Sequence, residues 1–328
     1  MIHQRIRSIT LISMIFCLLN ISGTAHAGDL EGDANMIIIA HRGASGKLPE
    51  HTLEGYRSAV LAGADFIEPD IVFTKDGVAV ARHDIYLSGS TDVAAHPEFA
   101  DRKRTFEERE DWFVFDFTLA EIKSLRAVQP RPGRSKALDG LYEIPTLEEI
   151  IALVADYAGK GHIVGLYPEL KRPALFAAKA IDPAGDLLAH LAALDAKVSG
   201  IPVYIQSFDY VYLGQLPGKS RYPLIALVDS LYDDDGRMTH VPEMGLDELR
   251  QFDGVGINKG LLITAEGKSS GYVQRAHALG LKVHVWTVRD DDLPAQFSSV
   301  GEELAAIRAM GADGIFTDFP GSAHQYLR

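Results

Sequence analysis

The sequence predicts an α/β protein, a TIM-type (β/α)8 barrel with an inserted segment after the second strand. Short, continuously apolar segments alternate with helical segments along the chain. Continuous apolar strands between helices are typical of a parallel sheet that is covered on both faces. Roughly eight strand–helix steps follow one another, which is the number that a closed barrel requires. An open, doubly wound sheet is the main alternative.

The predicted elements follow one another in a regular order. Strands are predicted at 36–40, 65–73, 78–82, 162–168, 202–206, 223–228, 254–257, 281–286 and 313–317. Helices are predicted at 53–62, 118–126, 146–158, 174–197, 246–252, 271–279, 301–310 and 320–327. Thr118 and Thr146 each precede a glutamate by three residues, which is the pattern of a capping box at a helix start. Glycines at 63, 280 and 311 mark helix ends.

One long segment, residues 87–145, departs from this alternation. It is polar, contains the stretches RKRTFEERED (102–111) and QPRPGRSKALDG (129–140), and holds one predicted helix. Two interpretations are open. The segment is either a solvated insertion or a cap over the mouth of the barrel that influences substrate choice.

The N-terminus has the pattern of a cleaved signal peptide. Two arginines precede an apolar stretch at 9–21, and the motif AHA follows at 25–27. The apolar stretch is short for a membrane span. We therefore expect removal of residues 1–27 on export to the periplasm, which leaves residues 28–328 as a single barrel domain. An uncleaved amphipathic anchor is the alternative.

The composition argues against polyanionic partners. The chain has 32 Lys and Arg against 45 Asp and Glu, a net charge of −13. Loss of residues 1–27 removes two arginines and no acidic residue, which takes the charge to −15. A strongly acidic protein is repelled by nucleic acid and by anionic lipid. We expect no nucleic-acid binding and no stable membrane association. The one cysteine, Cys17, lies in the signal peptide, so no disulfide is expected.

Polar side chains suited to catalysis end nearly every predicted strand. They are His41 and Arg42, Glu68 and Asp70, His83 and Asp84, Glu169 and Lys171, Gln206, Asn258, Trp286, and Asp318. In a (β/α)8 barrel the C-terminal ends of the strands meet at one face and form the active site. The sequence therefore predicts that these side chains lie together.

Three carboxylates, Glu68, Asp70 and Glu169, are candidate ligands of a metal. Side chains at positions i and i+2 of a strand share a face, so Glu68 and Asp70 are expected to point together. Carboxylate oxygens suit Ca²⁺ or Mg²⁺, whereas zinc is disfavoured. In the alternative interpretation, Glu68 and Asp70 cap strand ends or form ion pairs with Arg42 and Lys171.

Two histidines and two cations complete the candidate site. His41 and His83 are the natural acid and base, because histidine titrates near neutral pH. Arg42 and Lys171 suit a phosphate, the arginine through its bidentate fork and the lysine as a point charge. The pattern indicates acid–base chemistry on a phosphate-containing substrate.

Six blocks of the sequence resemble the glycerophosphodiester phosphodiesterase family, most closely its long, exported bacterial type. They are HRGASGKLPEHT (41–52), GADFIEPDIVFTKDGVAVARHD (63–84), YPELK (167–171), QSFD (206–209), VHVWTVRDDDLP (283–294) and GADGIFTDFP (311–320). The resemblance extends from residue 37 to residue 327. It implies a TIM-type barrel with an insertion after the second strand, in agreement with the pattern of elements.

The resemblance also implies roles for individual residues. His41 and His83 are implied as the acid/base pair, Glu68, Asp70 and Glu169 as ligands of one divalent metal, commonly Ca²⁺ or Mg²⁺, and Arg42 and Lys171 as the phosphate-binding pair. Phe208 and Trp286 match positions that line the glycerol or alcohol pocket. Pro69 departs from close relatives, which often have a polar residue between the two acids, and no loss of metal is expected from it.

The implied reaction is hydrolysis of a glycerophosphodiester, such as glycerophosphocholine or glycerophosphoethanolamine, to sn-glycerol 3-phosphate and an alcohol. Attack by the C2 hydroxyl through a cyclic phosphate and direct attack by water are both open. A phospholipase D-like or phosphoinositide-type lipase is the alternative enzyme, and the net charge of −15 disfavours it. A non-catalytic surface binding protein on the same barrel would need no paired histidines.

Overall fold

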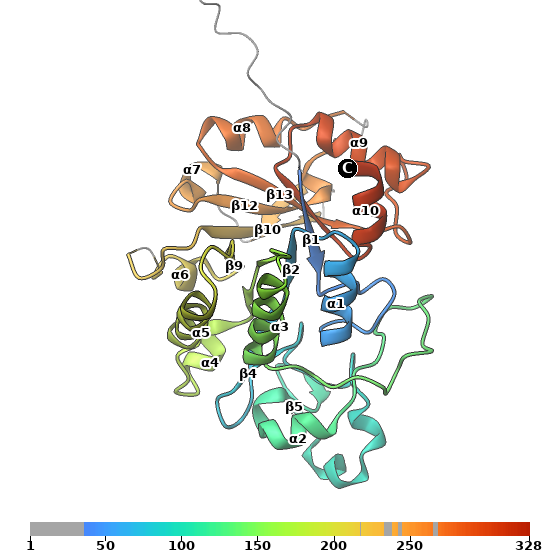
Figure 1. The fold of residues 1–328 in the computed structure, drawn as a ribbon, viewed down its shortest axis with the longest axis vertical. Coiled ribbons are helices and arrows are strands. Elements are labelled where there is room, and N and C mark those ends of the chain that lie inside the picture. The colour runs from blue at the N-terminus through green and yellow to red at the C-terminus, as the bar shows by residue number, and fades with distance from the viewer. Residues whose placement is uncertain (1–35, 217, 233–237, 242–244, 265–267) are drawn as a thin grey trace, which may run out of the picture. The chain divides into compact units, whose positions relative to one another are not determined.

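The computed structural model describes residues 36–216, 218–232, 238–241, 245–264 and 268–328 (Figure 1). The predicted signal peptide, residues 1–27, lies outside the described residues. Within the described part of the chain, no helix combines the length and the apolar character that a membrane span requires.

Parallel strands follow one another around a closed ring in chain order. They are β1 (Ile37–His41), β2 (Phe66–Glu68) continued by β3 (Asp70–Phe73), β7 (Gly165–Leu166) continued by β8 (Glu169–Leu170), β9 (Ile205–Ser207), β10 (Leu224–Tyr232), β12 (Gly254–Asn258), β13 (Lys282–Val288) and β14 (Gly314–Thr317). The last strand, β14, pairs in parallel with β1. The predicted barrel is confirmed, and the open doubly wound sheet is wrong.

Prolines interrupt two of these strands without ending them. Pro69 separates β2 from β3, and Pro168 lies between β7 and β8. Proline has no N–H, so each strand loses a donor at that position. The proline carbonyls still form hydrogen bonds between strands. Glu169 N donates to Pro69 O over 2.9 Å, and Gln206 N donates to Pro168 O over 3.0 Å. The register therefore continues through both prolines and pairs Asp70 with Glu169 on neighbouring strands.

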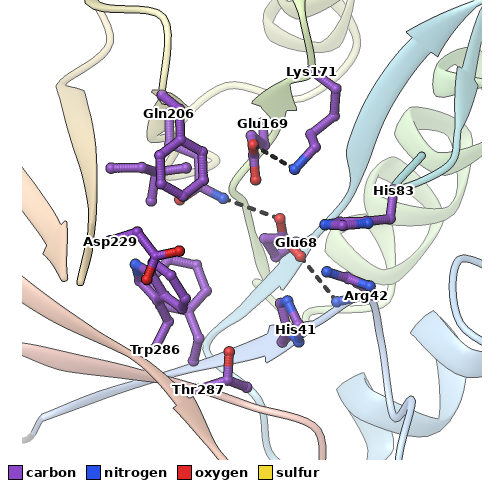
Figure 2. Close-up of a pocket in the computed structure, with 13 residues that line it drawn as sticks. His41, Arg42, Glu68, His83, Glu169, Lys171, Gln206, Asp229, Trp286 and Thr287 are labelled. Carbon is purple, nitrogen blue, oxygen red and sulfur yellow. Dashed lines mark hydrogen bonds and ion pairs between the residues drawn. The ribbon is translucent and has the colours of Figure 1, made fainter. Parts of the chain in front are cut away.

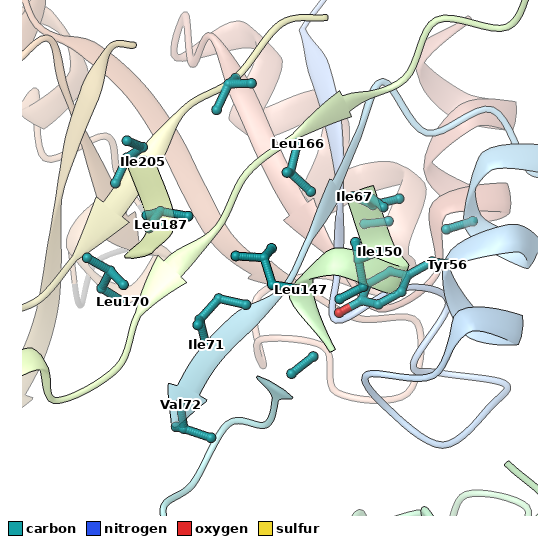
Figure 3. Close-up of a cluster of buried hydrophobic side chains, with 14 of the residues drawn as sticks. Tyr56, Ile67, Ile71, Val72, Leu147, Ile150, Leu166, Leu170, Leu187 and Ile205 are labelled. Atoms are coloured by element: carbon teal, nitrogen blue, oxygen red, sulfur yellow. The ribbon is translucent and has the colours of Figure 1, made fainter. Parts of the chain in front are cut away.

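Helices cover the outer face of the ring (Figure 1). They are α1 (Leu53–Leu61), α3 (Leu147–Gly159), α4 (Pro173–Ala177), α5 (Pro183–Lys197), α6 (Tyr210–Leu213), α7 (Leu246–Leu249), α8 (Tyr272–Ala278), α9 (Val300–Ala309) and α10 (Pro320–Leu327), with the 3₁₀ turn η4 (Lys259–Leu261). The main core lies between strands and helices. Figure 3 shows Ile67 and Ile71 of the second strand close to Leu147 and Ile150 of α3, and all four are buried.

A second cluster of buried side chains fills the inside of the barrel. It consists of Ile39, Phe66, Tyr167, Ile225 and Phe316. Most of these residues precede a strand-end polar residue by two positions, so they form the layer directly beneath it. His284 belongs to the same layer, where its ring is buried and its Nδ1 lies 2.7 Å from the Tyr167 hydroxyl. An apolar floor therefore underlies the strand ends.

Two predicted elements differ in the structure. The segment predicted as strand 78–82 forms β4 (Ala79–Ala81), which pairs antiparallel with β3 and lies outside the parallel ring. A parallel pairing needs a crossover of a dozen residues or more, and only a short turn closed by Thr74 separates β3 from β4. The predicted helix 174–197 is divided into α4 and α5, because Pro183 starts a new helix that Asp182 caps.

The inserted segment 87–145 has structure of its own. It contains η1 (Val93–Ala95), η2 (Pro97–Arg102), the hairpin β5 (Arg104–Phe106) and β6 (Arg109–Asp111), η3 (Val114–Asp116) and α2 (Leu119–Ser124). Its buried aromatic side chains belong to the main core. Its last part returns to the strand ends, where Gln129 Nε2 donates to Ser45 O over 3.0 Å. A separate hairpin strand, β11 (Met238–Val241), extends β10.

The buried His284 predicts a pH-dependent stability. Burial lowers the pKa of His284 to about 4 from 6.5, so between these pH values the unfolded chain binds a proton that the folded chain excludes. Stability therefore falls as the pH drops through this window. The variant His284→Gln keeps a hydrogen-bonding side chain but does not titrate. Between pH 7 and 4.5 its free energy of unfolding should fall by about 2–3 kcal/mol less than that of the wild type. Urea unfolding at both pH values measures this, and equal losses in the two proteins would contradict it.

Candidate active site

A cavity of about 200 Å³ opens where the barrel strands end. It is lined by His41, Arg42, Glu68, His83, Glu169, Lys171, Gln206, Phe208, Leu227, Asp229, Trp286, Thr287 and Phe316. In the view of Figure 2, Glu68 lies between His83 and Arg42 on one side and Asp229 and Trp286 on the other. All residues predicted to have a catalytic, metal-binding or substrate-binding role line this cavity except Asp70, whose carboxylate lies close to that of Glu68. Of the other strand-end residues predicted to lie together, Gln206 lines the cavity, whereas Asp84, Asn258 and Asp318 do not.

Three carboxylates from two neighbouring strands form the centre of the site. Glu68 ends β2, Asp70 begins β3 and Glu169 begins β8. One oxygen of each lies within 4.8 Å of the others, and all three residues are buried. Gln206 Nε2 donates to Glu68 Oε1 over 3.0 Å, while Gln206 Oε1 is buried without a hydrogen-bond partner among the described residues. Three carboxylates with hard oxygen donors therefore converge, a set that fits a Ca²⁺ or Mg²⁺ ion.

Cations neutralise this acidic cluster only in part. Arg42 Nε lies 3.1 Å from Asp70 Oδ2, and Lys171 Nζ lies 2.8 Å from Glu169 Oε1 and 3.9 Å from Asp70 Oδ1. Glu68 has no ion-pair partner in the part of the chain that the structure describes. The alternative interpretation of these acids as ion-pair partners thus holds for Asp70 and does not hold for Glu68.

Burial and neighbouring charges shift the pKa of each of the three acids. Burial raises the pKa of Glu68 well above its usual range, and the nearby Asp70 and Glu169 raise it further. Burial also raises the pKa of Glu169 to about 8, although Lys171 opposes this. For Asp70, burial is outweighed by Lys171 and Arg42, which hold its pKa well below the usual range. A divalent cation would relieve the mutual repulsion of these carboxylates.

The loop after β1 holds Arg42 in place. Arg42 and His51, at its two ends, both have left-handed backbone conformations with φ of 60° and 56°. Arg42 Nη1 donates to Glu50 Oε2 over 2.9 Å, which adds to its contact with Asp70. Gly43 has φ 85°, and a Cβ there would lie 2.8 Å from the backbone of α1. The tight approach of the loop to α1 therefore requires glycine at this position.

His41 is paired with a carboxylate from the last strand. Its Nδ1 lies 2.6 Å from Oδ1 of Asp318, which follows β14 and is buried. Burial and the neighbouring Arg42 lower the pKa of His41 to about 4, against the effect of Asp318. Burial alone would raise the pKa of Asp318, but His41, Arg289 and Arg134 hold it well below its usual range. An ionised Asp318 only accepts, so His41 carries its proton on Nδ1 and leaves Nε2 as an acceptor.

His83 reaches the same cavity from the β3–β4 hairpin. His83 follows β4, which pairs antiparallel with β3. The preceding residue, Arg82, still pairs with β3, because its N–H donates to Asp70 O over 2.9 Å. Nδ1 of His83 lies 3.0 Å from Asp84 Oδ1, and its side chain is about one-third exposed at 34%. The two candidate acid/base residues thus differ, since His41 is largely buried and His83 faces solvent.

The wall opposite the histidines is aromatic. The rings of Phe208 and Trp286 meet edge-on with centroids 5.9 Å apart. Trp286 Nε1 donates to Gly256 O over 2.8 Å, which fixes the indole. Lys171 Nζ lies 5.8 Å from the centre of the Phe208 ring. This wall offers apolar contact to a small ligand whose charged part lies near Lys171.

Sequence reasoning assigned no role to several groups that the structure places at the site. Asp318 and Gln206 are strand-end polar residues, and this position was the only signal for them. His51 is fully buried and connects Asp70 to Tyr56, with Nε2 2.9 Å from the carboxylate and Nδ1 2.8 Å from the hydroxyl. Together these groups support a site that can bind an anion, hold a cation and move protons.

The comparisons with known proteins agree on one family. The model of the glycerophosphoryl diester phosphodiesterase family matches residues 41–322. A glycerophosphodiester phosphodiesterase of Arabidopsis thaliana is 34% identical over 318 residues, covering 88% of this chain and 85% of the relative. A glycerophosphodiester phosphodiesterase of Haemophilus influenzae is 30% identical over 348 residues and covers 94% of each chain.

Solved structures show the same fold. A putative glycerophosphoryl diester phosphodiesterase from Silicibacter pomeroyi has a TM-score of 0.64 and 29% identity, covering 90% of this chain and 94% of that one. A phosphodiesterase of Oleispira antarctica, solved with the product sn-glycerol-3-phosphate, has a TM-score of 0.59 and 23% identity over 89% of this chain and 96% of its own. The chain therefore belongs to the glycerophosphoryl diester phosphodiesterase family and is an enzyme with glycerophosphodiester phosphodiesterase activity.

Proposed function

We propose that this enzyme hydrolyses glycerophosphodiesters such as glycerophosphocholine and glycerophosphoethanolamine to sn-glycerol 3-phosphate and the free alcohol, with one divalent cation and two histidines. The observation that carries the proposal is the convergence of His41, His83 and the carboxylates of Glu68, Asp70 and Glu169 around one cavity. A site that only bound its ligand would not need two histidines, each with a carboxylate on Nδ1.

The donor set favours Ca²⁺, with Mg²⁺ as the second candidate. Ca²⁺ takes six to eight oxygen ligands, amide carbonyls included, whereas Mg²⁺ is usually held by one or two carboxylates and keeps several waters. The three carboxylates of Glu68, Asp70 and Glu169 would hold the ion. When bound, it would polarise a phosphoryl oxygen and make a nearby hydroxyl more acidic.

The positions of the cations and the aromatic wall suggest how the substrate lies. Arg42 and Lys171 would take the phosphate, because both side chains line the cavity and both are held near the acidic cluster. Phe208 and Trp286 would contact the carbon skeleton of the glycerol or of the alcohol. Neutralisation of the phosphate charge in a partly dry site would be the main effect on rate.

The two histidines divide the proton transfers between them. His41 is neutral at physiological pH, and Nε2 would take the proton of the attacking C2 hydroxyl as the new O–P bond forms. His83 would give a proton to the alcohol oxygen as the old P–O bond breaks. In the second step water attacks the cyclic phosphate, passes its proton to His83, and the C2 oxygen regains its proton from His41.

Metal dependence tests the reaction class. We expect purified residues 28–328 to release sn-glycerol 3-phosphate from glycerophosphocholine with Ca²⁺, less with Mg²⁺, and none with EDTA. Glu169→Gln should raise the Ca²⁺ concentration for half-maximal rate at least ~10-fold, because the ion loses one charged ligand. A coupled assay for glycerol 3-phosphate measures both. Full activity in EDTA would overturn the role of a metal.

The acid and the base can be told apart by changing the leaving group. With glycerophosphocholine, His41→Ala and His83→Ala should each lower kcat by at least ~10². With a 4-nitrophenyl ester of glycerol phosphate, whose leaving group needs no proton, His83→Ala should recover most of its rate and His41→Ala should not. Absorbance of nitrophenolate is the measurement. Equal recovery of the two variants would refute the division of roles.

Export is a further part of the proposal, supported by the pattern of residues 1–27. We expect the full chain with a C-terminal tag, expressed in a Gram-negative host, to accumulate in the periplasmic fraction. Its N-terminal sequence should begin at Gly28. A chain that is recovered uncleaved in the membrane fraction would instead support the amphipathic anchor.

A further inference from the structure

We propose that Arg134, which the inserted segment carries to the strand ends, is a positioning residue for His41 and acts through Asp318. The inference rests on the proposed function, in which His41 is the base. It gives the insertion a part in catalysis, in place of a role as a solvated loop or a cap that only shapes substrate choice.

Arg134 is buried at a junction of three segments. Only 4% of its side chain is exposed. Nη2 donates to Asp318 Oδ2 over 2.6 Å, and Nη1 donates to Ser45 O over 3.1 Å in the loop that follows His41. Nε and Nη2 also donate to the two carboxylate oxygens of Asp291 over 2.7 and 3.0 Å. The guanidinium thus connects the insertion, the first loop and the last strand.

The two oxygens of Asp318 have separate partners. Oδ1 faces Nδ1 of His41, while Oδ2 accepts from Arg134 Nη2 and from Arg289 Nε over 2.8 Å. Two guanidinium groups hydrogen-bond to Oδ2, and Arg131 Nε lies 3.9 Å from the same oxygen. The two hydrogen bonds fix the rotation of the carboxylate, and this rotation keeps Oδ1 directed at His41. A carboxylate held in this way stabilises one tautomer of the imidazole and one ring orientation.

The insertion supplies a second hydrogen bond to Asp318 and a contact with the loop that follows His41. Arg289 follows β13 of the barrel and donates through Nε to Oδ2 of Asp318. Arg134 adds the shorter contact and, through Ser45 O, fixes the backbone next to His41, whose own carbonyl accepts from Ser45 Oγ over 2.8 Å. Both ends of the His41–Asp318 pair are therefore held by one side chain.

A purely structural role makes a different prediction. If Arg134 only fastened the insertion to the barrel, its pair with the half-exposed Asp291 would serve that purpose as well as its contact with Asp318. Asp291→Asn should then impair the enzyme as much as loss of the arginine. If Arg134 acts on His41, loss of the Asp291 contact leaves the contact with Asp318 and leaves kcat nearly unchanged.

The experiment compares Arg134→Met, Arg134→Lys, Asp318→Asn and Asp291→Asn in the full mature enzyme with glycerophosphocholine. We expect Arg134→Met to lower kcat about 10- to 100-fold and Asp318→Asn about 10²-fold or more, with KM and the Ca²⁺ requirement within threefold of wild type. Arg134→Lys should recover part of the loss. The double variant with Arg134→Met and Asp318→Asn should have the same kcat as Asp318→Asn alone, because both substitutions act through one carboxylate.

Arg104→Met is the matched control. Arg104 lies in the same insertion and forms a comparable two-bond pair with Asp116, over 2.7 and 3.1 Å, away from the cavity. It should retain wild-type kcat. Unchanged kcat in Arg134→Met, or equal losses in Asp291→Asn and Arg134→Met, would overturn the proposal.

A readout independent of activity separates this inference from the proposed function. In ¹⁵N-histidine-labelled protein, the His41 nitrogen shifts of the wild type and of Arg104→Met should report a single Nδ1–H tautomer. Arg134→Met and Asp318→Asn should report a mixture. If the wild type is inactive yet shows the single tautomer, the proposed function fails and the positioning by Arg134 stands. If Arg134→Met does not fold, the His41 nitrogen shifts are compared between Asp318→Asn and Asp291→Asn instead. Equal shifts in these two variants would contradict the inference.

Discussion

The burial of three carboxylates beside one another is the constraint on which the site depends. Glu68, Asp70 and Glu169 repel one another in a region shielded from water, and an unpaired buried charge costs several kcal/mol. The surrounding groups compensate this cost. Lys171 and Arg42 contact two of the acids, and Gln206 donates to the third. A divalent cation bound among these acids would offset the repulsion that remains.

The barrel provides this arrangement because side chains at every second position of a strand point to the same face. Several strand-end polar residues lie two positions beyond a buried apolar residue, as His41 follows Ile39 and Glu68 follows Phe66. The polar groups therefore share one layer above an apolar floor that water does not reach. A low local dielectric strengthens every charge interaction in that layer. The same floor explains how a single contact with Asp318 can determine the state of His41.

Much of this arrangement can be predicted from the sequence. The end of a strand, and the face to which each of its side chains points, can be recognised from neighbouring residues alone. The grouping of Glu68 with Asp70, and the location of the site, follow from them. The partner of His41 does not, since Asp318 is 277 positions away and reaches it only because β14 closes the ring against β1. Arg134 lies in a polar stretch without periodicity, so no local pattern indicates its burial. The predicted strand 65–73 runs through Pro69, and the structure shows how, since the carbonyl of Pro69 accepts from the next strand.

The pairing of the last strand with the first has a consequence for how activity appears as the chain is made. His41 is among the first folded residues to leave the ribosome, and the carboxylate that holds it is among the last. A partly synthesised chain therefore contains His41 without the carboxylate of Asp318 that pairs with it in the folded protein. Under the proposed mechanism, hydrolysis therefore begins only when the ring closes, so that activity of the chain reports that folding is complete.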